Sequence, residues 1–202
     1  MGERVVETGV ASRPAVGEER SGDRAVIARH EDCVLIAVVD ALGHGPEAAR
    51  AADAAEAVLQ EFAAEPPQAL VQRCHAGLRG TRGVALSLAV FTDAQHSMTW
   101  LGVGNVEARL LRTAPAGAVT LASLATAGGT VGDRLPPLTP ATLEVQRGDT
   151  LVFATDGVKR NFADSLDLAG AAQQVADRIL HDHERPVDDR LVVVARLLGR
   201  LP

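Results

Sequence analysis

The sequence predicts an α+β fold built from mostly antiparallel strands, and two observations lead to this class. Most of the apolar, β-branched segments follow one another across short polar turns, as antiparallel strands do. The helical segments stand apart from the strand runs, whereas a doubly wound parallel sheet needs a helix after nearly every strand. We therefore expect helices layered on antiparallel sheets, in a single domain over residues 1–202.

The expected strands form an N-terminal, a central and a C-terminal group. In chain order they are Arg4–Ala11, Arg24–His30, Cys33–Val39, Val84–Thr92, His96–Val103, Val106–Thr113, Ala118–Leu124, Leu143–Gln146, Thr150–Thr155 and Leu191–Leu197. Turns at Glu31–Asp32 and Ala94–Gln95 join two neighbouring pairs. We also expect Leu143–Gln146 and Thr150–Thr155 to form a hairpin.

Three segments carry helical patterns. Pro46–Phe62 is rich in alanine, the best helix former, and its proline stands in the first turn, where proline is tolerated. Pro67–Leu78 and Leu166–Leu180 each place apolar side chains on one helical face. Ser12–Ser21 and the Gly- and Pro-rich Ala127–Pro140 are expected to be loops.

Composition and charge exclude several classes of protein. Apolar residues make up 47% of the chain but aromatic residues only 2%, so the core must consist of Ala, Val and Leu. A net charge of -6 without a basic cluster argues against a nucleic-acid partner. The longest aliphatic run, Val34–Val39, is too short to span a bilayer, and no apolar leader follows Met1. Cys33 and Cys74 indicate no disulfide framework, so we expect a cytoplasmic protein without a membrane partner.

Four aspartates stand at the ends of apolar runs or at glycine turns. Asp40 and Asp156 follow two buried strands, Asp23 follows a Ser-Gly pair, and Asp188 precedes the last strand. A strand that stops at a carboxylate presents that carboxylate at the rim of its sheet. Several converging carboxylates repel one another unless a cation joins them, and hard divalent cations prefer oxygen ligands. The pattern therefore indicates a metal-dependent reaction centre.

Five motifs surround these aspartates in order, along nearly the whole chain. They are Ser21-Gly22-Asp23, Asp40-Ala41-Leu42-Gly43-His44-Gly45, Gly128-Gly129-Thr130-Val131-Gly132, Gly148-Asp149-Thr150-Leu151-Val152-Phe153-Ala154-Thr155-Asp156-Gly157 and Asp188-Asp189. As an ordered set they resemble the PPM-type (type 2C) metal-dependent serine/threonine protein phosphatases, in particular the SpoIIE-like and RsbX-like bacterial branch. The resemblance implies an αββα sandwich, two antiparallel sheets flanked by helices, and hydrolysis of phosphoserine or phosphothreonine.

The same resemblance implies a site with two Mn²⁺ or Mg²⁺ ions. Asp40 would bridge them, and the backbone carbonyl of Ala41 would be a further ligand. Asp156 and Asp188 would bind one ion, and Asp23 would support the site from the paired strand. A metal-activated water can attack a phosphoryl group directly, which agrees with the lack of a CxxxxxR loop or a GxSxG elbow.

Ala41 departs from the family pattern, which usually has glycine after the bridging aspartate. An alanine carbonyl can still bind a metal if the backbone φ at Ala41 is below zero. If the turn requires φ above zero, the side chain costs on the order of 1 kcal/mol or more.

Other motif residues have two interpretations each. His44 is either a general acid for the leaving serine oxygen or a residue that starts the helix. Asp188 and Asp189 compete for one ligand role, and the other is solvated or supports the site from behind. Asn105 is most simply a turn residue. Gly128-Gly129 either cradles a phosphate or belongs to a loop packed near the site.

The leading functional hypothesis is a phosphoserine/phosphothreonine phosphatase acting on a folded regulatory protein. By analogy with RsbX-like domains, the partner would be a phosphorylated STAS-domain or anti-sigma-factor antagonist-type protein of a stressosome pathway. The alternatives are a catalytically weak, phosphatase-like module that binds a phosphorylated regulator, and a metal hydrolase of small phosphate esters. Comparing the turnover of phosphopeptides with that of small phosphate esters distinguishes the small-ester hydrolase from the protein phosphatase.

Overall fold

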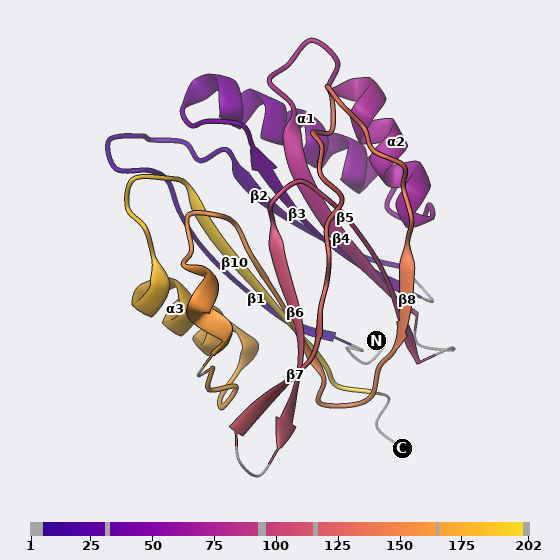
Figure 1. Ribbon diagram of the computed structural model, residues 1–202, viewed down its shortest axis with the longest axis vertical. Helices are drawn as coiled ribbons and strands as arrows, with labels where there is room; N and C mark the ends of the chain where they lie inside the picture. Colours follow the sequence, from indigo (N-terminus) through magenta and orange to yellow (C-terminus); the bar gives the residue numbers. More distant parts are fainter. Residues whose placement is uncertain (1–5, 31–32, 93–95, 115–116, 165, 200–202) are drawn as a thin grey trace.

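Two antiparallel sheets lie face to face, and helices cover the outer face of each (Figure 1). This computed structural model describes residues 6–30, 33–92, 96–114, 117–164 and 166–199. Within these ranges each sheet has five strands and three α-helices are present. The predicted α+β class and αββα layering are therefore confirmed.

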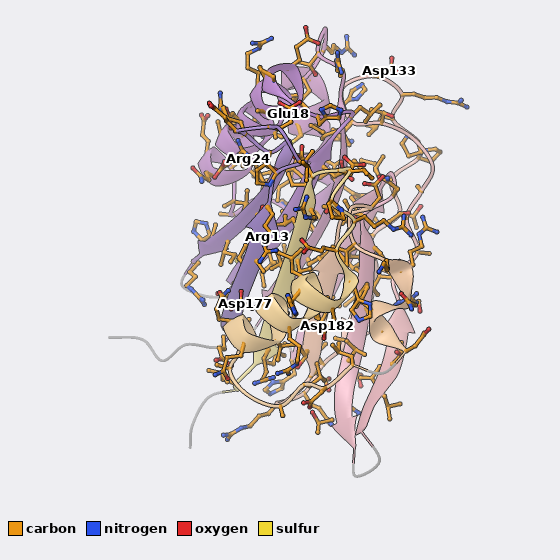
Figure 2. All side chains as sticks on the ribbon, turned by 90° about the vertical axis from the view of Figure 1, so that its left-hand side faces the viewer. Arg13, Glu18, Arg24, Asp133, Asp177 and Asp182 are labelled. Atoms are coloured by element: carbon orange, nitrogen blue, oxygen red, sulfur yellow. The ribbon has the colours of Figure 1, made fainter. Side chains whose placement is uncertain are left out.

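The first sheet has the strand order β2-β3-β4-β5-β8. Its strands are β2 (Asp23–Arg29), β3 (Cys33–Ala41), β4 (Val84–Thr92), β5 (Ser97–Val103) and β8 (Ala141–Glu144). Helices α1 (Pro46–Glu61) and α2 (Pro67–Gly77) cover its outer face (Figure 1). Arg24 on β2 ties α1 down, because its Nη2 donates to Asp53 Oδ1 over 2.6 Å; Figure 2 labels this arginine.

The second sheet has the order β1-β10-β9-β6-β7. Its strands are β1 (Val6–Arg13), β6 (Glu107–Ala114), β7 (Gly117–Ser123), β9 (Thr150–Ala154) and β10 (Arg190–Leu197). Helix α3 (Ala172–His183) packs on its outer face, and the β6–β7 hairpin projects from one end of the molecule (Figure 1). The predicted edge strand near the N-terminus is confirmed, since β1 pairs only with β10.

The core lies in three layers, between the sheets and beneath each set of helices. Small aliphatic side chains dominate all three, as the composition predicts. Between the sheets Trp100 stacks on Phe153 with ring centroids 5.7 Å apart. Strands β3, β9 and β10 are buried almost throughout, because both of their faces are covered.

Two predictions about local structure are wrong. The hairpin between Leu143–Gln146 and Thr150–Thr155 does not form, because β8 pairs with β5 in the first sheet and β9 lies in the second. The C-terminal helix begins at Ala172 instead of Leu166. Gly170 has φ +94°, and the chain enters the helix only after this turn.

A further element, the 3-10 helix η2 (Arg160–Ala163), was not predicted. The turns expected at Glu31–Asp32 and Ala94–Gln95 lie outside the described residues, as do Arg4 and Val5 of the expected first strand. In the parts of the chain that are described, no helix is both long and apolar enough to cross a lipid bilayer.

Candidate metal centre

Asp40 occupies the end of β3, directly opposite Asp23 on β2. The two residues are partners in the antiparallel register, so the fold sets one carboxylate beside the other. Asp23 is buried, with a relative exposure of 4%, and its Oδ2 accepts a hydrogen bond from Thr155 Oγ1 over 2.8 Å. Asp23 is therefore a buried carboxylate beside Asp40, and aspartates are almost never fully buried unless they are paired.

A cleft of about 380 Å³ opens at this end of the sheets. Four of the sequence-predicted site residues line it: Asp40, Ala41, Asp156 and Asp188. The end of β3, the turn after β9 and the segment before β10 thus bring distant parts of the sequence together. Asp23 and His44 do not line the cleft.

The chain between β3 and α1 turns tightly to make one wall of the cleft. Gly43 and Gly45 have φ values of +79° and +81°, which residues with a side chain rarely adopt. Helix α1 then begins at Pro46, as predicted. The glycines of this motif therefore serve the backbone path, and they leave the cleft wall at Gly43 without a side chain.

Ala41 has a backbone φ below zero. Among the described residues that are not glycine, His96 alone has a positive φ. Ala41 is the last residue of β3, is 2% exposed, and donates its amide to the carbonyl of Gly22 over 3.1 Å. The strain that an alanine could have caused at this position is therefore absent.

Asp188 and Asp189 have different places. Asp188 lines the cleft, whereas Asp189 is 3% exposed and turned into the protein. The Asp189 carboxylate accepts hydrogen bonds from two backbone amides, Ala15 at 2.8 Å and Gly22 at 2.6 Å. Asp189 therefore holds the loop before β2 in place, and the solvated interpretation of this residue is wrong.

Asn105 is more than a turn residue, because its side chain orients an aspartate of the cleft. Its Nδ2 donates to Asp156 Oδ2 over 2.8 Å, and the residue itself lines the cleft. The sequence indicated only the turn between two strands. An amide side chain at the same sheet end as the aspartates was the available clue.

His44 lies on the rim, on the exposed stretch between β3 and α1. Its Nδ1 is 2.8 Å from Glu18 Oε1, and the His44 side chain is 55% exposed. Figure 2 shows Glu18 at the end of the molecule where α1 lies, opposite the β6–β7 hairpin. The ring is therefore held by the loop before β2, next to the cleft but outside its lining.

The glycine-rich loop forms another part of the cleft wall. Gly128, Gly129 and Thr130 line the cleft. Backbone hydrogen bonds in both directions join Val84 to Val131 at 2.9 Å, and the Gly132 amide donates to His75 Nδ1 over 3.0 Å. The loop is thus fixed at the site, which agrees with the interpretation of Gly128-Gly129 as a packed loop.

The carboxylates in and behind the cleft raise one another's pKa, because each negative charge makes ionisation of its neighbours less favourable. Burial raises the pKa of Asp40 to about 8, and the charges of Asp156, Asp188 and Asp189 add to this rise. Burial and the neighbouring Asp40 likewise raise the pKa of Asp23. Burial and Asp188 raise the pKa of Asp156, while the hydrogen bond from Asn105 opposes the rise.

One oxygen of the cluster has no hydrogen-bond partner. Asp40 Oδ2 is buried and unpaired, although buried polar atoms are usually satisfied. Within the described ranges no three His, Cys, Asp or Glu side chains are grouped closely enough to form a metal-binding set by themselves. The carboxylates share one cleft, where their negative charges repel one another. A divalent cation would offset this repulsion and accept the unpaired Asp40 oxygen as a ligand. The donor chemistry of these carboxylates therefore fits such an ion, with water and backbone carbonyl oxygens completing its ligands.

Two layered antiparallel sheets with an acidic cleft at the strand ends define a PP2C-type phosphatase domain. A family model for stage II sporulation protein E (SpoIIE) matches residues 30–198. The chain belongs to this SpoIIE family of PP2C-type serine/threonine phosphatases.

Among characterised proteins, the chain is similar to phosphoserine phosphatase RsbX of Bacillus subtilis (strain 168). The two are 27% identical over 101 residues, and this alignment covers 50% of each chain. The chain thus matches about half the length of that relative.

Solved structures show the same fold over almost the whole chain. One solved structure comes from work on the bacterial stressosome, described as a modular system that has been adapted to control secondary messenger signaling. It is 31% identical to this chain with a TM-score of 0.84, and the match covers 96% of this chain and 100% of that one. RsbX in complex with magnesium has 20% identity and a TM-score of 0.82, covering 98% of each chain. PstP/Ppp of Mycobacterium tuberculosis has 14% identity and a TM-score of 0.74, covering 97% of this chain and 100% of that one.

Proposed function

We propose that the protein removes phosphate from phosphoserine or phosphothreonine on a folded regulatory partner, using Mn²⁺ or Mg²⁺. The observation that carries this proposal is the buried, unpaired Oδ2 of Asp40 in a cleft shared with Asp156 and Asp188. Among the described residues no Cys, Ser or His lines the cleft, and its clustered carboxylates fit hydrolysis by a metal-held water. The magnesium complex of the similar RsbX supports the choice of metal.

The proposed roles follow the positions of the side chains. Asp40, Asp156, Asp188 and the carbonyl of Ala41 would hold two ions, with Asp40 between them. Asp23 would keep Asp40 in place from β2, and Asn105 would keep the Asp156 carboxylate turned into the cleft. When bound, the ions would lower the pKa of the attacking water and offset charge on the phosphoryl oxygens.

His44 would take part as a general acid only if its ring turns from Glu18 toward the leaving oxygen. In its present position the Nδ1–Glu18 contact fixes the ring on the rim. Replacing Glu18 by Gln would then leave the reaction intact, whereas His44→Ala would slow esters with poor leaving groups more than activated aryl esters.

The partner is proposed to be a phosphorylated STAS-domain or anti-sigma-factor antagonist-type protein. The similarity to RsbX and to a stressosome-related structure supports this class. Of the five large exposed apolar side chains in the described ranges, Leu42 lines the cleft, Val187 directly precedes the cleft residue Asp188, and Val16 lies on a loop hydrogen-bonded to Pro186. Exposed apolar groups beside a polar cleft suit docking of a folded surface.

The first test is hydrolysis of an aryl phosphate with Mn²⁺, with excess chelator, and with Mn²⁺ restored. We expect activity only with metal, and loss of nearly all of it in Asp40→Asn. Full activity in chelator would overturn the metal-dependent reaction. Binding of a phosphorylated partner without any turnover would instead favour the phosphatase-like binding module.

The second test concerns the partner. We expect an intact phosphorylated STAS-domain protein to have a much higher kcat/KM than a peptide carrying the same phosphosite, because remote contacts help position the phosphate. Equal values for the two substrates would remove the folded-partner proposal while leaving the phosphatase activity in place.

A further inference from the structure

A second groove adjoins the metal cleft along the start of β6. Its volume is about 330 Å³, and it shares Gly104 and Asn105 with the cleft. The other lining residues come from the start of β6, from the chain at and after the end of β7, and from η2; they include Glu107, Ala108, Arg109, Leu124, Thr126 and Arg160. A group bound in the metal cleft therefore lies next to this groove, with only the Gly104–Asn105 turn between them.

The groove carries surplus positive charge. Its ionisable lining residues are Arg109, Arg160 and Glu107, which gives +2 and −1, a net charge of +1. The whole chain has a net charge of -6, so this balance is unlike that of the protein at large. Cationic charge beside a phosphatase cleft favours an anionic ligand.

Arg160 has little to hold it in the groove. Its Nε is 3.9 Å from Glu107 Oε2, and its side chain is 75% exposed. Glu107 is already bound by Arg109 through a hydrogen bond from Nη2 to Oε1. Arg109 in turn has a buried Nε without a hydrogen-bond partner. The groove thus offers a largely exposed guanidinium, that of Arg160, which is only weakly paired.

The wall of the groove is preformed. The amide of Leu124 donates to the carbonyl of Ala108 over 3.0 Å, and Thr126 Oγ1 donates to the carbonyl of Gly104 over 2.6 Å. Trp100 Nε1 reaches the carbonyl of Ala125 at 3.3 Å. Because the wall needs no ordering when a ligand enters, binding there costs less conformational entropy.

We propose that this groove binds the polypeptide adjoining the phosphorylated residue, and that Arg160 pairs with an acidic side chain of that segment. The proposal rests on the proposed phosphatase function, since it places the phosphorylated residue in the metal cleft. It predicts that the protein prefers substrates with an aspartate or glutamate on one side of the phosphorylated residue. The number of residues between the two is set by the Gly104–Asn105 turn, which separates the cleft from the groove.

The test is a set of phosphoserine peptides that differ only in the position of a single aspartate, with matched asparagine peptides. With Mn²⁺-loaded wild-type protein we expect aspartate at one or two adjacent positions to raise kcat/KM over asparagine by about two- to fivefold, the range of exposed ion pairs. Arg160→Ala should remove this preference, and Arg160→Glu should reverse it in favour of a lysine peptide. The preference should also weaken as salt is added.

Arg185→Glu is the matched control. The positive charges of Arg185 and Arg160 both lower the pKa of Asp156, yet Arg185 does not line the groove. Both variants should change turnover of a small aryl phosphate, but only Arg160→Glu should change the preference among peptides. The same shift in preference in Arg185→Glu would overturn the proposal.

Binding measurements separate this proposal from the phosphatase function. If the metal-loaded protein hydrolyses phosphopeptides but treats aspartate and asparagine alike at every position, the groove proposal fails and the phosphatase function stands. If nothing is hydrolysed, fluorescence anisotropy with the same labelled peptides still decides: a position-specific preference for aspartate that depends on Arg160 supports the groove, and equal affinities overturn it.

Discussion

Asp23 and Asp40 face each other across the β2–β3 ladder, where the antiparallel register makes them direct partners. Like charges directly opposite one another on neighbouring strands destabilise a sheet. The pair is kept because Thr155 donates to Asp23 and because the cleft in front of Asp40 can admit a cation. The strand register itself therefore builds the charge repulsion that a metal ion would relieve.

The metal-free protein should lose stability as the pH rises. The pKa of Asp40 is raised from 3.8 to about 8 in the folded state, so its stabilising contribution is complete below the unfolded value and is lost as pH passes through the folded one. One pKa unit is worth about 1.4 kcal/mol, which moves the Tm of a domain of this size by roughly 3–6 °C. Thermal melts in chelator at pH 5 and pH 8.5 measure this, and Asp40→Asn should flatten the difference. An equal pH dependence in both proteins would contradict the assignment to Asp40.

Asn105→Ala should weaken metal-dependent activity without unfolding the protein. The variant frees the Asp156 carboxylate, which Asn105 holds through a 2.8 Å hydrogen bond. Loss of a residue that orients a ligand typically costs about 10- to 100-fold in metal affinity or activity. A Mn²⁺ titration of aryl phosphate hydrolysis measures the midpoint, and melts in chelator check the fold. An unchanged midpoint and rate would show that the Asn105 contact is dispensable.

Ala41→Gly should not tighten metal binding. Ala41 already has φ below zero, so glycine relieves no strain. It should instead lower stability by roughly 0.5–1 kcal/mol, because glycine gains conformational freedom in the unfolded chain and weakens a strand. The two observables are the Mn²⁺ midpoint and the denaturation midpoint. A lower Mn²⁺ requirement in the glycine variant would mean that the alanine does hinder the site.

Asp188→Asn and Asp189→Asn should fail in different ways. Asp189→Asn leaves one of the two backbone amides at Ala15 and Gly22 without its acceptor, at a cost of about 1–3 kcal/mol. Asp188→Asn keeps the fold but should raise the Mn²⁺ requirement, since Asp188 lines the cleft. Both variants are measured by thermal melts in chelator, which report stability, and by Mn²⁺ titration of activity, which reports the metal requirement. The same profile for both variants would contradict the separate roles.

The double variant Val16→Ser with Val187→Ser should impair the dephosphorylation of a folded partner only. Both side chains are exposed on adjoining loops near the cleft, since the Val16 amide donates to the carbonyl of Pro186. We expect lower kcat/KM for the phosphoprotein and little change for an aryl phosphate. The matched control is Val119→Ser with Leu121→Ser, equally apolar positions on the projecting hairpin of Figure 1. An equal effect of both pairs would contradict docking around the cleft.

The sequence alone determined the α+β class, the small aliphatic core and the strand ends that carry Asp40 and Asp156. Those features are local: apolar runs mark the strands, and alanine-rich segments mark α1. Chain order does not determine which strands pair over long separations. Leu143–Gln146 and Thr150–Thr155 are predicted to form a hairpin, yet β8 pairs with β5 at the edge of the first sheet and β9 lies between β10 and β6 in the second.

Only the tertiary structure decided the finer parts of the site. Asp188 and Asp189 are neighbours in sequence, but backbone amides from a loop more than 160 residues away capture Asp189 and leave Asp188 at the cleft. Asn105 gains its role because the start of β6 pairs with the end of β9, with Glu107 opposite Ala154, a contact that no local pattern encodes. The sign of φ at Ala41 likewise depends on the pairing that extends β3 to its last residue. Residue type sets which chemistry is possible, and long-range packing sets which side chain performs it.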